Sequence, residues 1–466
     1  MHRNLPPTSA TTQPRSPTAP PRAPAWPLIG SLPGFLADPF RFVTEAQRER
    51  GDLYRLDLGV LEVLALNHPR HARHVFRDRA RIYTKGGVFW DSIRSFMGNG
   101  LPLSEGELWR RQRRMIQPHF HRASLAAMTD LMIAVIEAAM PRWDALADAG
   151  APFDAVPELT AITMQVIVRT MFGADISDRD TRTVSDALAY VVDYMFRGAA
   201  FNALPAWMPA PGRRRYREAG AAIDEVVGRL IARQRSGGGQ NGSLIATLVD
   251  AVDTETGAKV DNAQLRDEAV AMFLAGYETT SATVAWALYH LAHSPSAAAE
   301  LDAEVDAVLG TTAPTLADLP QLPHTRWVLQ EALRLNGPIF WIWRTATEDD
   351  EIDGYRVRAG STVSLMVHAM HRHPSLWTRP ERFEPERFSP GHSAGAQPAP
   401  WMPFGTGQRQ CVGLDFAMIE GQLILTRIAQ RYRLHAVPER VPKPHLATII
   451  QARGGLWLRL EHRLRS

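Results

Sequence analysis

Helical periodicity dominates the middle of the chain. Over residues 107–309 apolar positions recur three and four residues apart, which predicts a succession of amphipathic and buried helices. The pattern breaks near Gly150, Gly173 and Gly212, and again in the glycine-rich segment 236–243. Since glycine is common just beyond helix ends, we expect these positions to separate individual helices.

Strand-like alternation is confined to short segments outside that helical region. Residues 53–58 and 60–66 alternate as two strands of a hairpin, and shorter runs follow at 352–357, 362–367 and 456–460. The predicted fold class is therefore mainly α with small β-sheets.

Composition narrows the class of protein further. The chain has 466 residues, 45% of them hydrophobic, and a net charge of only +3, which does not favour nucleic-acid binding. Residues 1–25 are rich in Pro, Thr, Ser and Ala and contain no long apolar run, so we expect a disordered tail without a membrane anchor. The remainder, 26–466, is predicted to be one large domain of a cytoplasmic protein.

Cys411 is the only cysteine, and it lies in the glycine-rich segment 404–413 directly before an amphipathic helical stretch. The N–H groups and dipole of a helix N-terminus lower the pKa of a thiol, which favours a nucleophile or a metal ligand. Gly405 permits a tight turn, while Phe404 offers an apolar ring and Arg409 a cation near the thiol. A buried structural cysteine is the alternative interpretation of the thiol taken alone.

A second unusual segment interrupts the apolar helical run 263–292. Residues 275–280 read Ala-Gly-Tyr-Glu-Thr-Thr, so that Gly276, Glu278 and Thr279 stand where apolar helix formers are expected. Local departures of this kind concentrate at functional sites. An exposed helical turn without a role is the alternative.

Two pairs of residues share a helical face. Glu331 and Arg334 are three apart and Trp109 and Arg113 are four apart, so each pair lies on one side of its predicted helix. Such pairs are common on exposed helices. The segment 385–388, which contains Arg387, follows the first pair at a distance that allows it to fold back.

Taken in order, these segments resemble the cytochrome P450 superfamily. The match comprises F-G-x-G-x-R-x-C-x-G at 404–413, A-G-x-E-T-T at 275–280, E-x-x-R at 331–334 and P-E-R-F at 385–388. The resemblance implies a single large helix-rich domain with a small β-rich subdomain. It also implies a haem-thiolate monooxygenase that holds haem b, with Cys411 as the axial ligand of the iron.

The resemblance assigns a role to each matched residue. Gly276 leaves room for dioxygen, and Glu278 and Thr279 assist proton delivery during O–O cleavage. Glu331, Arg334 and Arg387 form a structural triad. The remaining cofactor-binding residues are Trp109, Arg113, Arg344, Phe404, Gly405 and Arg409. The arginines among them are expected to bind the haem propionates.

The predicted substrate is a hydrophobic small molecule that is hydroxylated or epoxidised, with terpenoid, fatty-acyl and polyketide-like compounds left open. We expect a mobile lid over 197–211. Apolar side chains mapped by their distance from the motifs suggest the pocket: Phe89, Trp90, Phe96, Tyr277, Ile339, Phe340 and Ile449.

Electrons are expected to come from separate proteins, because the chain ends soon after the last predicted strand. A ferredoxin or flavodoxin with its reductase is the expected donor, docking on a basic surface that includes Arg110, Arg111 and Arg114. We expect a monomer that uses O2.

Three alternatives accompany this hypothesis. His368, His371 and His373 are spaced closely enough to suggest zinc, although a surface helix is the simpler interpretation. A peroxygenase or hydroperoxide-rearranging enzyme would need no proton relay, and a haem sensor would bind the cofactor without turnover.

Overall fold

The computed structural model describes residues 19–59, 61–173, 177–197, 211–237, 242–251, 257, 259–391, 400–447 and 449–463. Residues 1–18 of the predicted tail and 198–210 of the predicted lid lie outside the described residues. Ala23 donates its N–H to the carbonyl of Arg55 and is buried. The packed structure therefore begins before residue 26.

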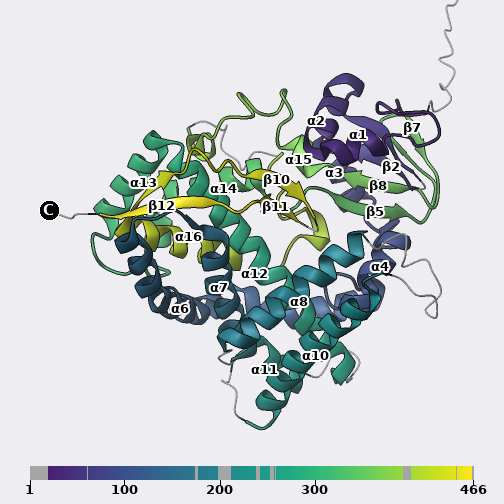
Figure 1. Cartoon of the computed structure of the whole chain (residues 1–466). Coiled ribbons are helices and arrows are strands. Elements are labelled where there is room, and N and C mark those ends of the chain that lie inside the picture. The colour runs from purple at the N-terminus through teal and green to yellow at the C-terminus, as the bar shows by residue number, and fades with distance from the viewer. Residues whose placement is uncertain are drawn as a thin grey trace, which may run out of the picture.

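Helices form most of the described structure (Figure 1). They are α1 (Leu32–Ala37), α2 (Pro39–Arg50), α3 (Pro69–Arg73), α4 (Val88–Met97), α5 (Gly106–Ile116), α6 (Arg122–Ala149), α7 (Ala155–Ile167), α8 (Asp178–Arg197), α10 (Arg213–Arg235), α11 (Leu244–Asp250), α12 (Asn262–Ala292), α13 (Pro295–Val308), α14 (Pro323–Asn336), α15 (Val367–Met370) and α16 (Leu414–Arg431). Single turns of tighter or wider helix are η1 (His74–Asp78), η2 (Gln117–Phe120), η3 (Val168–Phe172), η4 (Leu319–Gln321), η5 (Pro385–Phe388) and η6 (Gly407–Arg409).

The strands form small sheets around this helical body. The largest sheet has the order β1-β2-β8-β5-β3, a second has the order β4-β12-β9, and β6-β7 and β10-β11 are hairpins. Their bounds are β1 (Leu53–Leu58), β2 (Leu61–Leu66), β3 (Tyr83–Thr84), β4 (Phe153–Asp154), β5 (Ile342–Ala346), β6 (Asp350–Ile352), β7 (Tyr355–Val357), β8 (Thr362–Leu365), β9 (Tyr432–Ala436), β10 (Lys443–Leu446), β11 (Ile450–Arg453) and β12 (Trp457–His462).

The predicted hairpin 53–66 is confirmed as β1 and β2, and the predicted helix breaks at Gly150 and Gly173 are confirmed as left-handed helix ends. The single strand predicted over 352–357 is wrong. Asp353 and Gly354 both have positive φ, 51° and 80°, and turn the chain between β6 and β7. An Asp-Gly pair is a typical hairpin turn, and the pattern of alternation concealed it.

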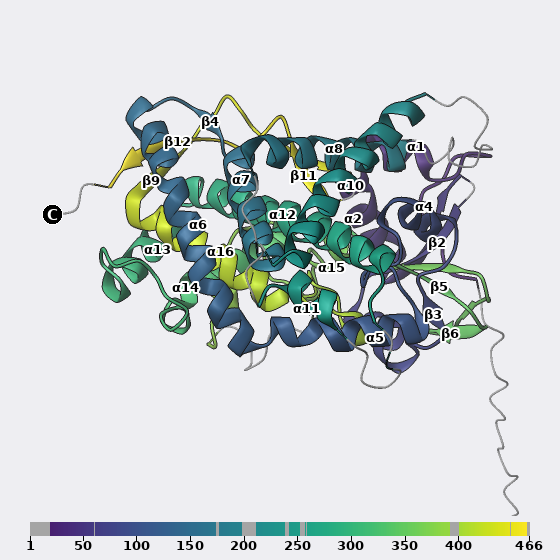
Figure 2. The same cartoon turned by 90° about the horizontal axis from the view of Figure 1, so that it is seen from below.

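Helix α12 is the central element, and α7, α10, α14 and α16 all pack against it (Figures 1 and 2). Gly276 allows a close contact with α7, because a Cβ built there would lie 2.2 Å from Cδ1 of Ile167. Its missing side chain thus accommodates a neighbouring helix, and the role expected of it beside dioxygen stays a prediction.

Helix α6 is, among the described residues, the helix whose length and composition would suffice to cross a membrane. Such a helix is weak evidence, because core helices pass the same test. Met132 and Trp143 are fully buried, and the Trp143 ring lies against Phe153 and Tyr432. Its apolar face thus belongs to the protein core.

Candidate active site

The segment that carries Cys411 is a tight loop leading into α16. Gly405 and Gly407 have φ of 72° and 73°, and a Cβ at Gly407 would lie 2.0 Å from the carbonyl oxygen of Phe76. The N–H of Cys411 donates to the carbonyl of Phe404 at 3.0 Å, which closes the loop. Glycine is therefore required for both the turn and the close approach to η1.

Burial and electrostatics act in opposite directions on the Cys411 thiol. Desolvation raises its pKa above the ordinary value, whereas the backbone N–H of Gly413 and the positive charge of Arg113 lower it. The expectation of a lowered thiol pKa is therefore wrong for the protein alone, because burial outweighs the helix terminus. By accessible surface, the Cys411 residue is nevertheless exposed.

Three basic side chains gather beside this loop around one carboxylate. Arg409 pairs with Glu105 at 2.5 Å, and Arg344, in the middle of β5, is 5% exposed. Burial and then Arg409 lower the pKa of Arg344 to about 10. Burial, followed by Arg344 and Arg409, lowers the pKa of Lys85, while Glu105 raises it. We call Lys85, Arg344, Arg409 and Glu105 the cationic cluster.

Helix α5 supplies the two residues that the sequence paired. The guanidinium of Arg409 lies over the Trp109 ring at 4.2 Å, a cation–π contact that fixes both groups. One turn further along, Arg113 donates to the carbonyl of Gln410 at 3.1 Å. The structure thus brings Trp109, Arg113 and Arg409 together next to the cysteine.

The acid and hydroxyl of α12 lie in the middle of that helix. Thr279 donates its hydroxyl to the carbonyl of Ala275 at 2.7 Å, and Glu278 accepts at Oε1 from the amide of Gln451 on β11 at 2.5 Å. Burial raises the pKa of Glu278, and the bond from Gln451 lowers it. Ala275 is exposed although it lies within a buried stretch of helix. This turn of α12 therefore retains accessible surface although most of the helix is buried.

The predicted triad is present as a buried ion-pair network. Glu331 accepts from Arg334 at 2.7 and 2.8 Å and from Arg387 at 2.9 Å. Glu331 and Arg334 are almost completely buried. The backbone N–H of Glu384 donates to the same carboxylate at 2.9 Å. These contacts join α14 to η5.

Comparison with known proteins decides the family. The family model for cytochrome P450 matches residues 20–457, which is nearly the whole chain. The chain belongs to the cytochrome P450 family. It is accordingly a haem-dependent monooxygenase, whose electrons come from redox partners and whose substrates are hydrophobic.

Curated relatives agree along their full length. Cyclooctatin synthase of Streptomyces melanosporofaciens is 34% identical, with 90% of each chain covered. Cyclooctat-9-en-7-ol 5-monooxygenase of the same organism is also 34% identical, with 93% of each covered. Pentalenene oxygenase of Streptomyces avermitilis is 30% identical and covers 94% of this chain and 96% of its own.

A solved structure agrees with the architecture. The cytochrome P450DA haem domain superposes with a TM-score of 0.86 at 27% identity, covering 97% of this chain and 99% of its own. The predicted P450 fold is thereby confirmed.

The residues around Cys411 fit a haem. Three basic groups share one carboxylate in the cationic cluster. Among the described residues, two of them therefore lack an acidic partner of their own, and a buried Nη1 of Arg409 has no hydrogen-bond acceptor. Haem carries two propionates, which match that surplus in number. A bound metal ion also deprotonates a coordinating thiol, which removes the cost of ionising Cys411 in a buried site.

Most side chains proposed for the substrate pocket are packed within the protein, and the Phe89 side chain lies outside the described residues. Phe340 belongs to an aromatic cluster with Phe35, Phe40 and His368. Phe96 is covered by Tyr216 of α10. Both are packed among other aromatic side chains, and their place in the pocket stays a prediction.

The remaining proposed pocket residues differ in burial. Tyr277 and Ile449 are 4% and 6% exposed, whereas Trp90 and Ile339 are half-buried. Tyr277 also packs within the core of the helical body, and its carbonyl accepts from Thr163 of α7 at 2.9 Å.

The three closely spaced histidines are buried rather than exposed on a surface helix. His371 accepts from the N–H of Met402 at 3.0 Å, His373 pairs with Asp52 at 2.9 Å, and Nδ1 of His368 contacts Arg372 at 3.1 Å. Their nitrogens thus have separate partners in different directions, which argues against a shared zinc ion. The surface-helix expectation was also wrong, because α15 packs against α2 and all three histidines are buried.

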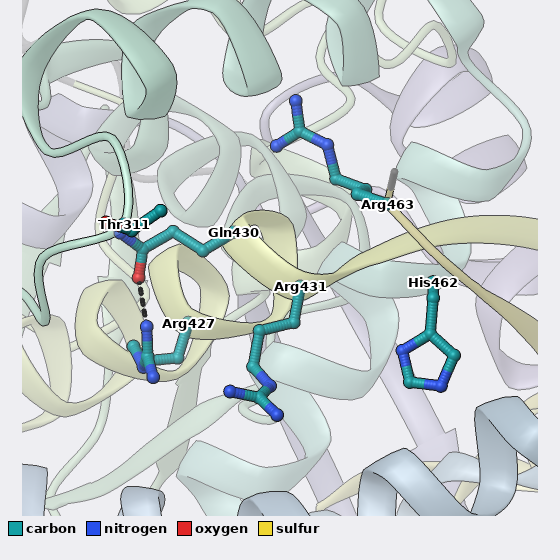
Figure 3. Close-up of a pocket in the computed structure, with 6 residues that line it drawn as sticks. All are labelled: Thr311, Arg427, Gln430, Arg431, His462 and Arg463. Carbon is teal, nitrogen blue, oxygen red and sulfur yellow. Dashed lines mark hydrogen bonds between the residues drawn. The ribbon is translucent and has the colours of Figure 1, made fainter. Parts of the chain in front are cut away.

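A cavity of about 260 Å³ lies where α16 meets β12, and Figure 3 shows its basic lining. Each of its arginines is paired with an acid: Arg427 with Glu137 at 2.8 Å, Arg431 with Asp144 at 2.6 Å and Arg463 with Asp306 at 2.6 Å. The positive charges of the three arginines are therefore neutralised within the protein.

Three residues of the site were missed by sequence reasoning. Lys85 and Glu105 complete the cationic cluster, and Gln451 holds Glu278. Each contacts a residue far away in the chain, and none stands in a recognisable local pattern. The scarcity of lysine, three in the whole chain, was the only signal that pointed to Lys85.

Proposed function

We propose that this P450 holds haem b non-covalently between Cys411 and α12 and oxidises cyclic terpenoids. The cationic cluster beside the cysteine is the observation that carries the cofactor assignment, because its surplus positive charge calls for two carboxylates. The chain has one cysteine, so it lacks the paired thiols of covalent haem attachment.

When bound, the haem supplies an iron centre at which O2 is activated and divided between substrate and water. Cys411 provides the thiolate ligand, and Arg344, Arg409 and Lys85 receive the propionates. The Trp109 ring stacks against the guanidinium of Arg409 and holds it in place. Arg113 ties α5 to the loop through the carbonyl of Gln410.

Glu278 and Thr279 are proposed to carry protons towards the oxygen. The raised pKa of Glu278 favours a carboxyl that holds a proton closer to neutral pH than an exposed glutamate does. The Thr279 hydroxyl bonds a carbonyl of its own helix, so it can exchange that acceptor for another by rotation about χ1.

The substrate assignment rests on three relatives at 30–34% identity whose names record oxidation in cyclooctatin and pentalenene metabolism. We infer a compact polycyclic terpene or terpene alcohol as the substrate class. The fatty-acyl and polyketide-like alternatives lose support, since neither is recorded in those names.

A ferredoxin with its reductase is the proposed electron donor. Arg110 and Arg114 are exposed on α5, the helix that leads to the cysteine loop. Arg111 does not belong to that surface, because it donates to Gln264 of α12 at 2.6 Å. An acidic donor would meet the exposed pair on the side of the protein nearest Cys411.

The decisive experiment for the cofactor is the absorption spectrum of the reduced, carbon-monoxide-bound protein. We expect the red-shifted Soret band of thiolate ligation, and its loss in Cys411→His while haem remains bound. Absence of that band in the unmutated protein would contradict the proposal.

The substrate class is tested by the spin-state shift of the ferric haem. Cyclooctat-9-en-7-ol is expected to displace the iron-bound water, and a saturated fatty acid of similar carbon number is the control. A larger shift with the fatty acid would overturn the terpenoid assignment.

A further inference from the structure

Gln451 makes a contact that none of the P450 motifs discussed above includes. It lies on β11, 173 residues after Glu278, and its Nε2 donates to Oε1 of that glutamate at 2.5 Å. Both side chains are partly buried. A hydrogen bond from a neutral amide to a buried carboxylate stabilises the charged form and fixes its orientation.

The backbone around Gln451 is held firmly. Ile450, the preceding residue, is 1% exposed and donates its N–H to the carbonyl of Pro338 at 2.8 Å. The strand also pairs with β10, where Gln451 lies opposite His445. The amide therefore reaches Glu278 from a fixed strand, and the strand, more than the helix, determines where the carboxylate points.

The two oxygens of Glu278 are not equivalent. Oε1 accepts from Gln451, whereas no hydrogen bond reaches Oε2 from the residues that the structure describes. Nor is Oε2 among the described buried atoms that lack a partner, so this oxygen retains some accessible surface. One oxygen is thus held while the other can bind and release a proton.

We propose that Gln451 is a positioning residue for proton delivery, which fixes Oε1 of Glu278 and directs Oε2 towards the oxygen-binding face of α12. This inference rests on the role proposed for Glu278.

The first test measures the carboxyl group itself. Infrared difference spectra between the unmutated protein and Glu278→Gln isolate the C=O stretch of protonated Glu278, which is then titrated with pH. In Gln451→Leu the pKa of Glu278 is expected to rise, because the bond that stabilises its ionised form is lost. An unchanged titration would overturn the proposal without involving turnover.

The second test measures the fraction of reducing equivalents that appear as hydrogen peroxide, with ferredoxin, its reductase and cyclooctat-9-en-7-ol. Gln451→Leu is expected to raise this fraction on the order of tenfold, part of the roughly 10²–10⁴-fold that positioned acid–base groups contribute. If this terpenoid does not shift the spin state, peroxide formation is measured without substrate. The variant Gln451→Glu is expected to return the hydrogen peroxide fraction towards that of the unmutated protein at acidic pH, because a protonated carboxyl can donate to Oε1 of Glu278.

A double-mutant cycle separates a failure of the inference from a failure of the proposed function. If the glutamine acts through the glutamate, Gln451→Leu should not raise the hydrogen peroxide fraction any further in a Glu278→Gln background. If Glu278→Gln alone does not raise the hydrogen peroxide fraction, the proposed role of Glu278 is wrong, and the inference about Gln451 is wrong with it. If Glu278→Gln raises this fraction but Gln451→Leu does not, only the inference about Gln451 is wrong. His445→Ala, on the facing strand, controls for a general loosening of the hairpin.

Discussion

Two groups of buried charges, the triad and the cationic cluster, differ in how completely they are satisfied. In the triad all five N–H groups of Arg334 donate: two bonds go to Glu331 and three to the carbonyls of His371, Pro380 and Arg382. In the cationic cluster a buried Nη1 of Arg409 has no acceptor. Three basic groups there also share the single carboxylate of Glu105.

The difference distinguishes a structural site from a ligand site. A buried charge is costly unless it is paired and hydrogen-bonded, so a fully satisfied network needs nothing further. Burying basic groups without acidic partners costs free energy, and a bound anion lowers that cost. The triad should therefore affect folding, and the cationic cluster should affect haem retention.

The largest expected effect is on the triad. Glu331→Gln leaves two guanidiniums without their shared carboxylate, and we expect it to lower the free energy of unfolding by about 3–5 kcal/mol. Urea unfolding followed by circular dichroism measures this loss. Glu384→Gln is the matched control, because it removes a partly exposed carboxylate that also contacts Arg387. Equal losses in the two variants would contradict the central position given to Glu331.

A third buried acid extends the comparison, because it has no cationic partner among the described residues. Glu268 on α12 accepts from the N–H of Leu101 at 2.9 Å, and its other oxygen has no donor. Burial, followed by the charge of Asp267, raises its pKa from 4.5 to about 7 despite the bond from Leu101. The native state therefore holds this proton more tightly than the unfolded state does.

The sign of the pH dependence follows from this difference. As pH rises from 4.5 to 7 the unfolded chain releases the proton first, so stability is lost across that interval, by about 3 kcal/mol in total. Glu268→Gln should remove this part of the decline. Urea melts at pH 5 and pH 8 measure it, and an equal decline in both proteins would show that Glu268 does not titrate in this range.

The next effect compares one arginine from each group. Arg409→Ala is expected to speed haem dissociation by roughly 10–100-fold, the equivalent of about 1.5–3 kcal/mol for a hydrogen bond to a charged group, without destabilising the haem-free protein. Arg387→Ala should instead destabilise the protein. Transfer of haem to a scavenging globin measures the first quantity and urea unfolding the second. Identical behaviour of the two variants would remove the distinction between the sites.

Local spacing predicted the residues that act through neighbours in the chain. The pairs Glu331–Arg334 and Trp109–Arg113 and the tight turn at Gly405 depend on helical geometry and on φ, which sequence patterns report directly. The family resemblance added Arg387, whose partner is 56 residues away. These parts of the site could therefore be predicted from the sequence.

Tertiary packing determined the rest. Glu105 meets Arg409 across 304 positions and Gln451 meets Glu278 across 173, and nothing in either local sequence requires the contact. Burial likewise reversed the expected shift in the thiol pKa of Cys411 and placed His371 in the interior. Such outcomes depend on which segments become neighbours, and periodicity does not encode that.

The smallest expected effect concerns exposed charge. Arg110 pairs with Glu107 on the surface of α5, and Arg110→Ala should change the free energy of unfolding by less than about 0.5 kcal/mol. If α5 receives an acidic ferredoxin, the same variant should slow electron transfer at low ionic strength, and the difference should fade as salt screens the charges. Stopped-flow reduction of the haem measures this. Arg214→Ala is the matched control, since Arg214 is also exposed, on α10, and pairs with Glu218. A comparable slowing in both variants would mean that overall charge, and not a docking surface on α5, governs the encounter.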